Sequence, residues 1–149
     1  MSNRELGKIL LVEDNPNDAE LTLMALKKKK LANEIIWLKD GQEALDFLYC
    51  TDAYAGREKV NPVLMLLDIK MPRVDGIEVL KQIKEDPHLR RIPVVILTSS
   101  REECDLIEGY DNGANAFVVK PVDFNEFMES VSSMGAFWAI LNEVPPIKI

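Results

Sequence analysis

Histidine, cysteine and long hydrophobic runs are all scarce in this chain of 149 residues. The two cysteines, Cys50 and Cys104, form no C-x-x-C motif, and with one histidine in the whole chain a zinc or other thiolate metal site is not expected. No apolar run approaches the ~18 residues of a membrane-spanning helix, and the polar start M-S-N-R-E-L-G-K lacks the pattern of a signal peptide. We therefore expect a cytoplasmic protein with two reduced, partly buried thiols.

Positive charge is also in short supply, with 18 Lys and Arg against 25 Asp and Glu and a formal net charge of −7. No basic surplus is available to neutralise nucleic-acid phosphates or to dock on anionic membranes. The phosphate-cradling loops G-x-G-x-x-G and G-x-x-x-x-G-K-[ST] are absent too, which argues against a nucleotide or flavin site. We expect direct contact with neither nucleic acid nor membrane.

The sequence has the composition of one globular domain, with 47% hydrophobic and 29% charged residues. Short, mostly continuous apolar runs, typical of strands buried on both faces, alternate with amphipathic helical patterns. The runs cover residues 9–12, 35–38, 63–67, 94–97 and 117–119, and the predicted helices cover 16–30, 41–50, 77–83, 104–110 and 123–141. This alternation predicts an α/β fold in which helices cover both faces of a parallel sheet.

Polar residues mark the predicted helix boundaries. Asn15, Asp75 and Asp123 each precede a helical pattern and are expected to cap it, because their side chains accept hydrogen bonds from free backbone N–H groups. The lysine run 27–30 falls in the last turn of the first predicted helix, and we expect it to be a solvated helix end. Residues 52–60 are expected to form a polar loop before the third strand.

Charged and polar side chains follow the apolar runs. Glu13 and Asp14 follow the first run, and Asp68 follows the third. Thr98 and Lys120 follow the fourth and fifth runs. Ligands of open parallel sheets bind outside the carboxyl ends of the strands, so we expect these five side chains to converge on one edge.

Three carboxylates in one place need a cation. Carboxylates held ~4 Å apart repel by several kcal/mol at an effective dielectric constant of ~20. All the expected ligands are hard oxygens, which points to Mg²⁺, or Mn²⁺ in its place, with waters completing an octahedron. For Glu13 and Asp14 alone, a helix cap that faces water is an equal alternative; with Asp68, Thr98 and Lys120 at the other strand ends, the metal site is favoured.

Asp68 follows the apolar stretch V-L-M-L-L, so its carboxylate is expected to be held rigidly. A carboxylate of this kind can act as a nucleophile toward a phosphoryl group and form an aspartyl-phosphate. The metal and the ammonium of Lys120 would neutralise the phosphoryl oxygens, and Thr98 offers a hydroxyl donor to the same group.

Four motifs, L-V-E-D-N, L-L-D-I-K-M-P-R-V-D-G, L-T-S-S and F-V-V-K-P, resemble in their order and spacing the signature of the response-regulator receiver domain. The resemblance runs from about residue 8 to residue 130. It implies a doubly wound, flavodoxin-like (βα)5 fold with strand order 2-1-3-4-5. It also implies Mg²⁺-dependent phosphoryl transfer from a sensor histidine kinase to Asp68. Such a protein is not an enzyme but a phosphoacceptor that assists its own phosphorylation and dephosphorylation.

The resemblance assigns metal ligands by position. It makes Asp14 a direct ligand beside Asp68 and makes Glu13 a ligand that acts mainly through water. The backbone carbonyl of Lys70 is the third protein ligand. Glu13 replaces the commoner aspartate of the family, a frequent variant that leaves the metal site intact.

The resemblance also assigns the residues that respond to the phosphoryl group. Lys120 pairs with it, in a Lys120–Pro121 peptide that is usually cis in the family. Thr98 moves toward it after phosphorylation, and Phe117 matches the family's rotating aromatic residue but lacks the hydroxyl of a tyrosine.

Positions beside the pocket depart from the family or vary within it. Ser99 stands where a small alanine is typical. We hypothesise that Lys70 and Ser100, which flank the pocket, set the lifetime of the phosphate.

The chain ends soon after its last predicted helix, so we expect a stand-alone receiver spanning residues 1–149. Its output would then be a contact with a target protein, or relay of phosphate to a phosphotransfer protein. The apolar helix and tail at about 131–149 predict either packing onto the domain or a homodimer through the last helix. His88 is expected to be a surface residue rather than a phosphocarrier.

The connection D-P-H-L-R-R-I-P-V-V and the aromatic F-W tail resemble the receivers that partner bacterial phytochromes, notably in cyanobacteria. The upstream kinase would then be light-sensing. Two alternatives come from other classes. A phosphatase of the haloacid-dehalogenase type needs a second aspartate where Lys70 stands, and a nucleotide or flavin binder needs the phosphate-cradling loop that the sequence lacks. A receiver-like interaction module that carries no phosphate is a third alternative, against which the acidic set, Thr98 and Lys120 argue.

Overall fold

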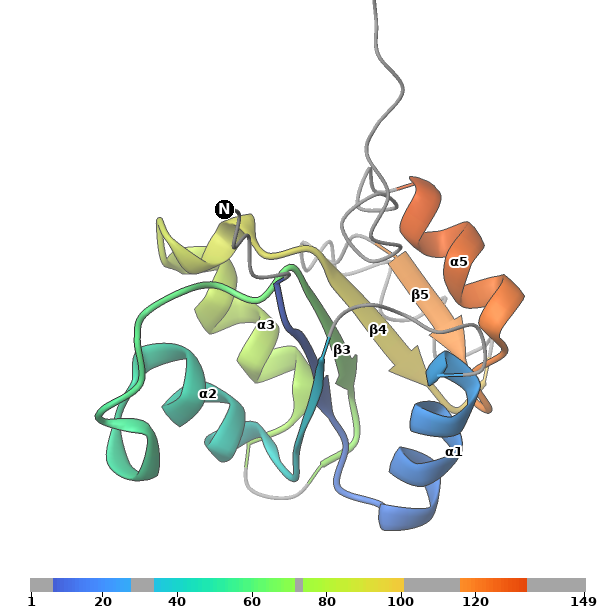
Figure 1. The fold of residues 1–149 in the computed structure, drawn as a ribbon, viewed down its shortest axis with the longest axis horizontal. Coiled ribbons are helices and arrows are strands. Elements are labelled where there is room, and N and C mark those ends of the chain that lie inside the picture. Colours follow the sequence, from blue (N-terminus) through green and yellow to red (C-terminus); the bar gives the residue numbers. More distant parts are fainter. Residues whose placement is uncertain (1–6, 28–33, 72–73, 101–115, 134–149) are drawn as a thin grey trace, which may run out of the picture.

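The computed structural model describes residues 7–27, 34–71, 74–100 and 116–133 (Figure 1). Five parallel strands form a single sheet in the order β2-β1-β3-β4-β5. Their bounds are β1 Ile9–Val12, β2 Ile35–Leu38, β3 Leu64–Asp68, β4 Val94–Thr98 and β5 Ala116–Val119. This is the 2-1-3-4-5 order of the flavodoxin-like α/β fold, so the predicted fold class is confirmed.

Helices cover both faces of the sheet, with α2 and α3 on one face and α1 and α5 on the other (Figure 1). The bounds are α1 Pro16–Lys27, α2 Gly41–Tyr49, α3 Gly76–Glu85 and α5 Phe124–Ser133, with short 3-10 helices η1 Asp52–Tyr54 and η2 Leu89–Arg91. Successive strand residues point to opposite faces, so Leu10 and Val12 join one apolar core cluster while Ile9 and Leu11 join the other. The sheet is therefore buried between two cores.

Two strands end later than predicted, at the edge that carries the polar residues. β3 extends to Asp68, because Asp68 still pairs with Leu97 of β4. β4 extends to Thr98, which pairs with Val119 of β5. The sheet ladder itself, rather than the loop that follows, therefore holds Asp68 and Thr98 in place.

The three predicted helix caps are confirmed. The side chain of Asn15 accepts hydrogen bonds from the backbone N–H groups of residues 17 and 18. Asp75 accepts from the N–H of Glu78 at 2.9 Å, and Asp123 accepts from the N–H of residue 126 at 3.1 Å. Cys50, which was predicted to lie in the helix, instead ends α2 in the left-handed conformation with φ 57°. Its thiol is free and partly buried, as predicted.

Several predictions fall on residues outside the described ranges. These are the helix at 104–110, most of the lysine run 27–30, Cys104, and the apolar tail with the homodimer that it would form. The assignment of residues 1–149 to one domain also stays a prediction. No helix within the described ranges has both the length and the apolar character needed to cross a membrane.

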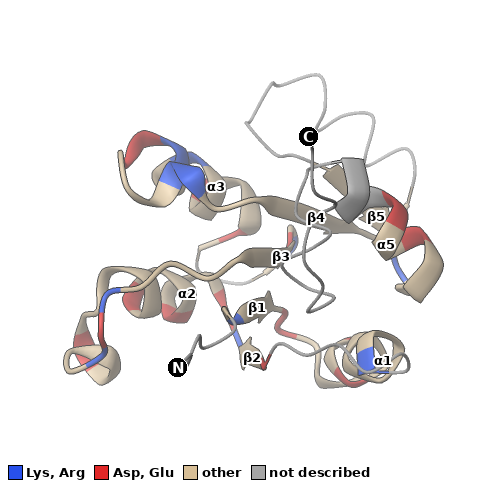
Figure 2. Ribbon diagram, turned by 45° about the horizontal axis from the view of Figure 1, so that its top comes forward, with Lys and Arg blue, Asp and Glu red and all other residues tan. Residues whose placement is uncertain are grey.

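Charge is distributed unevenly over the described residues (Figure 2). Acidic residues occur on α1, α2, α3 and α5, in keeping with the negative net charge of the chain. Basic residues gather where α3 ends and η2 begins, at Lys81, Lys84, Arg90 and Arg91. His88 directly precedes η2 and is exposed, as predicted.

Candidate functional site

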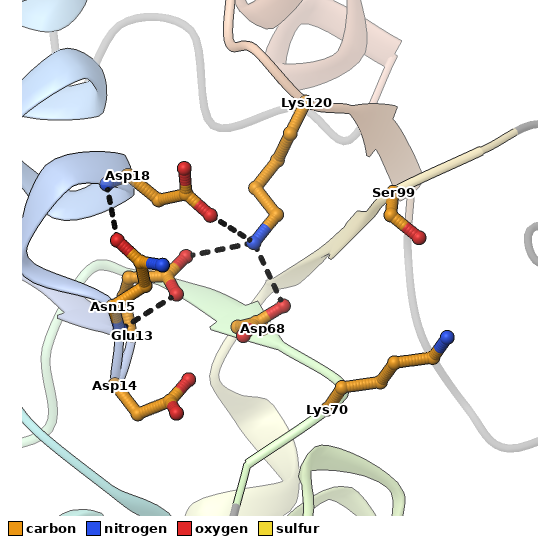
Figure 3. Close-up of a pocket in the computed structure, with 8 residues that line it drawn as sticks. All are labelled: Glu13, Asp14, Asn15, Asp18, Asp68, Lys70, Ser99 and Lys120. Atoms are coloured by element: carbon orange, nitrogen blue, oxygen red, sulfur yellow. Dashed lines mark hydrogen bonds and ion pairs between the residues drawn. The ribbon is translucent and has the colours of Figure 1, made fainter.

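A pocket of about 220 Å³ opens at the carboxyl edge of the sheet. Figure 3 shows side chains from the ends of β1, β3 and β5 and from the first turn of α1 turning toward one another. The pocket is lined by Glu13, Asp14, Asn15, Asp18, Asp68, Lys70, Ser99 and Lys120. Four of the five side chains that were expected to converge therefore do so, and Thr98 is the exception.

Three carboxylates lie close together in this pocket. Glu13, Asp14 and Asp68 each offer an oxygen atom, and these atoms all lie within 4.8 Å of one another. Glu13 is fully buried and Asp68 is 4% exposed, whereas Asp14 is exposed. Two such charges ~4 Å apart repel by about 4 kcal/mol at an effective dielectric constant of ~20. The cluster therefore requires a compensating positive charge.

Lys120 supplies one positive charge. Its ammonium lies 3.1 Å from Glu13 Oε1, 3.0 Å from Asp18 Oδ2 and 3.2 Å from Asp68 Oδ1 (Figure 3). The Lys120 side chain is 16% exposed, so these ion pairs are shielded from water more than ordinary surface pairs. The pocket is lined by four carboxylates and by two lysines, Lys70 and Lys120, so negative charge remains in excess.

The pKa values of the pocket residues reflect the same excess of negative charge. Burial, together with the charge of Asp68, raises the pKa of Glu13 to about 7 from its ordinary value of 4.5. Burial also raises the pKa of Asp68, although the charge of Lys120 opposes the change. Burial acts to lower the pKa of Lys120, but its hydrogen bond to Asp18 and the charges of Asp68 and Glu13 raise that pKa above its ordinary value.

Backbone hydrogen bonds fix the acidic residues that follow β1. The N–H of Glu13 donates to the carbonyl of Leu38 at 3.0 Å and so continues the β1–β2 ladder by one residue. The Glu13 carboxylate accepts from the N–H of Asn15 at 3.2 Å, and the Asn15 side chain caps α1. The chain therefore leaves the strand and enters the helix through a turn that aims Glu13 into the pocket.

Helix α3 lies tightly against the backbone of Asp68. The N–H of Gly76 donates to the carbonyl of Ile69 at 2.9 Å. A Cβ atom at position 76 would lie 2.3 Å from the carbonyl oxygen of Asp68, closer than Cβ atoms come to non-bonded atoms of other residues. Only glycine permits this approach, which clamps the backbone that follows Asp68.

Thr98 and Ser99 differ in their position relative to the pocket. Thr98 is fully buried, and its hydroxyl donates to the carbonyl of Ser100 at 3.1 Å. It does not line the pocket in this structure, whereas the next residue, Ser99, is exposed and does line it. Because Thr98 belongs to the strand ladder, its side chain turns away from the face toward which Ser99 points.

Two further expectations concern β5 and the peptide that follows it. The Lys120–Pro121 peptide bond is cis, as the resemblance implied. Phe117 is partly buried and packs against the core cluster of the α2 and α3 face.

Asp18 is the site residue that the sequence interpretation missed. It lies in the first turn of α1, and its carboxylate contacts Lys120 at 3.0 Å. The available signal was the predicted cap at Asn15, which places the first turn of the following helix at the same sheet edge as Glu13 and Asp14.

The donor set fits a hard divalent cation. Glu13, Asp14 and Asp68 contribute only oxygen atoms, and no histidine or cysteine is among the described residues that line the pocket. Oxygen ligands suit Mg²⁺ or Mn²⁺, whereas zinc sites favour nitrogen and sulfur. A divalent ion here would offset the negative charge that Lys120 leaves uncompensated.

Comparison with known proteins identifies the family. Residues 9–132 match the response regulator receiver domain. The probable methanogenesis regulatory protein FilR2 of Methanothrix harundinacea is 40% identical over 137 residues, which cover 92% of this chain and 86% of that protein. The structure of the bacteriophytochrome response regulator AtBRR superposes with a TM-score of 0.87 at 58% identity and covers 93% of this chain and 99% of its own.

A third relative is the response regulator Rcp1 of Synechocystis. Its Mn²⁺-bound crystal structure has a TM-score of 0.71 at 37% identity and covers 95% of this chain and 99% of that one. The chain therefore belongs to the response regulator receiver domain family and takes part in two-component signalling.

Proposed function

We propose that Asp68 accepts a phosphoryl group from a sensor histidine kinase in a Mg²⁺-dependent reaction in the cytoplasm. The observation that carries this proposal is the setting of Asp68. Its carboxylate ends a buried strand, lies 3.2 Å from the ammonium of Lys120, and shares the pocket with Glu13 and Asp14. A buried carboxylate, an ammonium and two further carboxylates therefore lie together, which supports the roles of nucleophile, phosphoryl contact and metal ligands.

The transfer is a displacement at phosphorus. A carboxylate oxygen of Asp68 forms the new O–P bond while the N–P bond of the kinase phosphohistidine breaks, and the imidazole nitrogen keeps that electron pair. Lys120, which contacts Asp68 before transfer, would contact the phosphoryl oxygens afterwards. Hydrolysis of the aspartyl-phosphate by water returns the carboxylate and releases inorganic phosphate.

Mg²⁺, or Mn²⁺ in its place, would neutralise charge on the phosphoryl oxygens when bound beside Asp68. We assign its ligands to Glu13, Asp14, Asp68 and the backbone carbonyl of Lys70. The oxygen-only cluster and its excess negative charge support this assignment.

The response to phosphorylation is assigned to Thr98 and Phe117. The Thr98 hydroxyl donates to the Ser100 carbonyl in this structure. When a phosphoryl group arrives, the hydroxyl would exchange this acceptor for a phosphoryl oxygen. Phe117 is partly buried and packs against the core cluster of the α2 and α3 face, so a change in its orientation would reach that cluster. Changed contacts at β4 and β5, which carry Thr98 and Phe117, would then pass the signal to a target protein or a phosphotransfer protein.

A partly apolar surface adjoins the pocket. A second pocket, lined in part by Leu21, Thr22 and Pro121, shares Asp18, Ser99 and Lys120 with the first. Leu21 is 52% exposed, and Met24 on the same helix is 62% exposed. These apolar side chains offer the kinase a contact face beside Asp68. Because AtBRR is described as a bacteriophytochrome response regulator, we propose a phytochrome-type kinase as the partner.

The proposal is tested by phosphorylation with acetyl phosphate, with Mg²⁺ or with chelator, in wild type and Asp68→Asn. Asp52→Asn, which changes an exposed aspartate of η1, is the matched control. We expect one phosphoryl group per chain in wild type and in the control when Mg²⁺ is present. Asp68→Asn should incorporate none.

Light scattering on the same samples tests the predicted homodimer. A doubled mass in either phosphorylation state would support the dimer through the last helix, and a monomer in both would contradict it. If wild type takes up no phosphate, the phosphoacceptor proposal fails and the chain is better described as a receiver-like interaction module.

A further inference from the structure

The indole of Trp37 is hydrogen-bonded to the backbone that carries the acidic pair. Its Nε1–H donates to the carbonyl oxygen of Glu13 at 2.8 Å. This contact joins the edge strand β2 to the turn in which Glu13 and Asp14 lie. The function proposed above gives Trp37 no role.

The Trp37 ring is held in place from several sides. Trp37 pairs with Leu11 in the β1–β2 register, and its partly buried side chain packs against the core cluster of the α1 and α5 face. The ammonium of Lys39 lies 5.7 Å from the centroid of the ring, within the range of a cation–π contact. The indole N–H is therefore a donor whose position the fold fixes.

The hydrogen bond constrains Asp14 through the peptide plane. The atoms from Cα of Glu13 to Cα of Asp14 lie in one plane, because the peptide bond has partial double-bond character. The N–H of Glu13 is already bound to the carbonyl of Leu38 at 3.0 Å. Once Trp37 also fixes the carbonyl oxygen of Glu13, the direction in which the chain delivers Asp14 is set.

Such a constraint is needed because the carboxylates repel one another. Oxygen atoms of Glu13, Asp14 and Asp68 lie within 4.8 Å of each other. Asp14 is exposed and would move away from Asp68 toward water if its backbone were free to turn. Metal sites gain affinity when groups outside the ligand set hold the ligands in their binding geometry.

We propose that Trp37 is a positioning residue that holds the Glu13–Asp14 peptide so that the acidic cluster is arranged for a divalent cation before the cation arrives. The inference rests on the proposed function, because it concerns the same metal site. Trp37 itself touches neither the metal nor the phosphoryl group. Its effect passes through the Glu13 carbonyl.

The experiment measures Mn²⁺ affinity by titration calorimetry in wild type, Trp37→Phe and Lys39→Ala. Trp37→Phe keeps an aromatic ring but removes the N–H donor, and Lys39→Ala removes the cation above the ring but keeps the hydrogen bond. We expect the Mn²⁺ Kd of Trp37→Phe to rise ~10-fold, the lower end of the effect for groups that orient metal ligands. Lys39→Ala should bind as wild type does.

The dependence of phosphorylation on Mg²⁺ separates positioning from general stability. Positioning predicts that the half-saturating Mg²⁺ concentration of Trp37→Phe rises with the Kd, while the rate at saturating Mg²⁺ stays within ~2-fold of wild type. A residue that only packs would lower the unfolding midpoint in chelator without moving the half-saturating concentration. An unchanged Kd in folded Trp37→Phe overturns the inference.

A second variant covers the case in which Trp37→Phe fails to fold. Site-specific incorporation of benzothienylalanine at position 37 keeps the bicyclic shape and replaces the N–H by sulfur, so packing is conserved and the donor alone is lost. The same ~10-fold rise in Kd is expected, and wild-type affinity contradicts the positioning role. If wild type itself binds no Mn²⁺, the proposed function fails rather than the inference about Trp37.

Discussion

The carboxylate of Glu13 is fully buried beside Asp68, and its charge opposes folding when no metal is bound. Burial and the neighbouring charge raise the pKa of Glu13 from 4.5 to about 7. Between these two values the folded protein holds more protons than the unfolded chain. The free energy of unfolding therefore falls as the pH rises from 4.5 to about 7, and this contribution levels off above pH 7.

Glu13→Gln removes this charge and should stabilise the metal-free protein at alkaline pH. In the presence of chelator, we expect the variant to gain up to about 3 kcal/mol over wild type at pH 8, because each unit of pKa shift corresponds to about 1.4 kcal/mol. At pH 5 the two proteins should be nearly equally stable. Urea denaturation at both pH values measures the difference, with the exposed Glu20→Gln on α1 as control. A stability difference that does not depend on pH would contradict the raised pKa of Glu13 as its cause.

Some of the site residues could be predicted from the sequence and others could not. Glu13, Asp14, Asp68 and Lys120 could be predicted because each one follows an apolar run, and parallel strands bring such positions to one edge. Asp18 and Trp37 could not be predicted in this way. The contact of Asp18 with Lys120 depends on the rotation of α1 about its axis, and the contact of Trp37 depends on a side-chain direction at an edge strand.

At the scale of elements, the contact between α3 and β3 connects packing with the site. Gly76 brings the first turn of α3 against the carbonyl of Asp68, and Asp75 caps the same turn. The motif V-D-G therefore combines a helix start with a close backbone approach. A change in the position of α3 would be transmitted directly to the backbone of Asp68.

Gly76→Ala should force α3 and Asp68 apart. We expect the free energy of unfolding to fall by about 1–3 kcal/mol, the usual cost of inserting a methyl group into a packed region. Acetyl phosphate should also phosphorylate the variant more slowly than wild type at saturating Mg²⁺.

Gly56→Ala is the matched control, because a Cβ atom at position 56 meets nothing within 4 Å. Denaturant melts and phosphorylation time courses on both variants provide the comparison. Wild-type stability in Gly76→Ala would show that the helix shifts freely and that the clamp on Asp68 is absent.

The elements themselves were more predictable than their ends. All five strands appear within one or two residues of the predicted runs, because short continuous apolar segments that alternate with helical patterns are typical of parallel strands buried on both faces. The predicted ends of the third and fourth strands were one residue too early, because ladder pairing continues through Asp68 and Thr98. The apolar run stops before these residues, but they still take part in the sheet.

For the molecule as a whole, the acidic cluster of the proposed metal site lowers stability when no cation is bound. The repulsion among the carboxylates destabilises the metal-free fold, and a divalent ion that binds only the folded state should restore stability. At a free Mg²⁺ concentration ~100-fold above the Kd, the expected gain is about 2.7 kcal/mol.

Thermal or urea unfolding with Mg²⁺ and with chelator, at matched ionic strength, measures this gain. Asp14→Asn removes one ligand and should lose most of it, whereas Asp52→Asn should retain it. If Asp14→Asn is stabilised as much as wild type, Mg²⁺ acts on the surface charge of the chain and not at the proposed site.

The sequence by itself determined the architecture and the chemical character of the site. Alternating apolar runs and helical patterns specified the layered sheet, and the charged residues after those runs specified an acidic edge with one lysine. These properties follow from local periodicity and from the rule that parallel strands share a carboxyl edge.

Only the tertiary structure decided how the site groups meet. Lys120 contacts Glu13 across 107 residues of chain, Thr98 turns to Ser100, and Trp37 bonds to the Glu13 carbonyl. All three contacts depend on side-chain direction, and the contacts of Lys120 and Trp37 also depend on the distance between elements that lie far apart in sequence. Periodicity fixes which face a residue occupies, but the packing of the whole molecule fixes which neighbour it reaches.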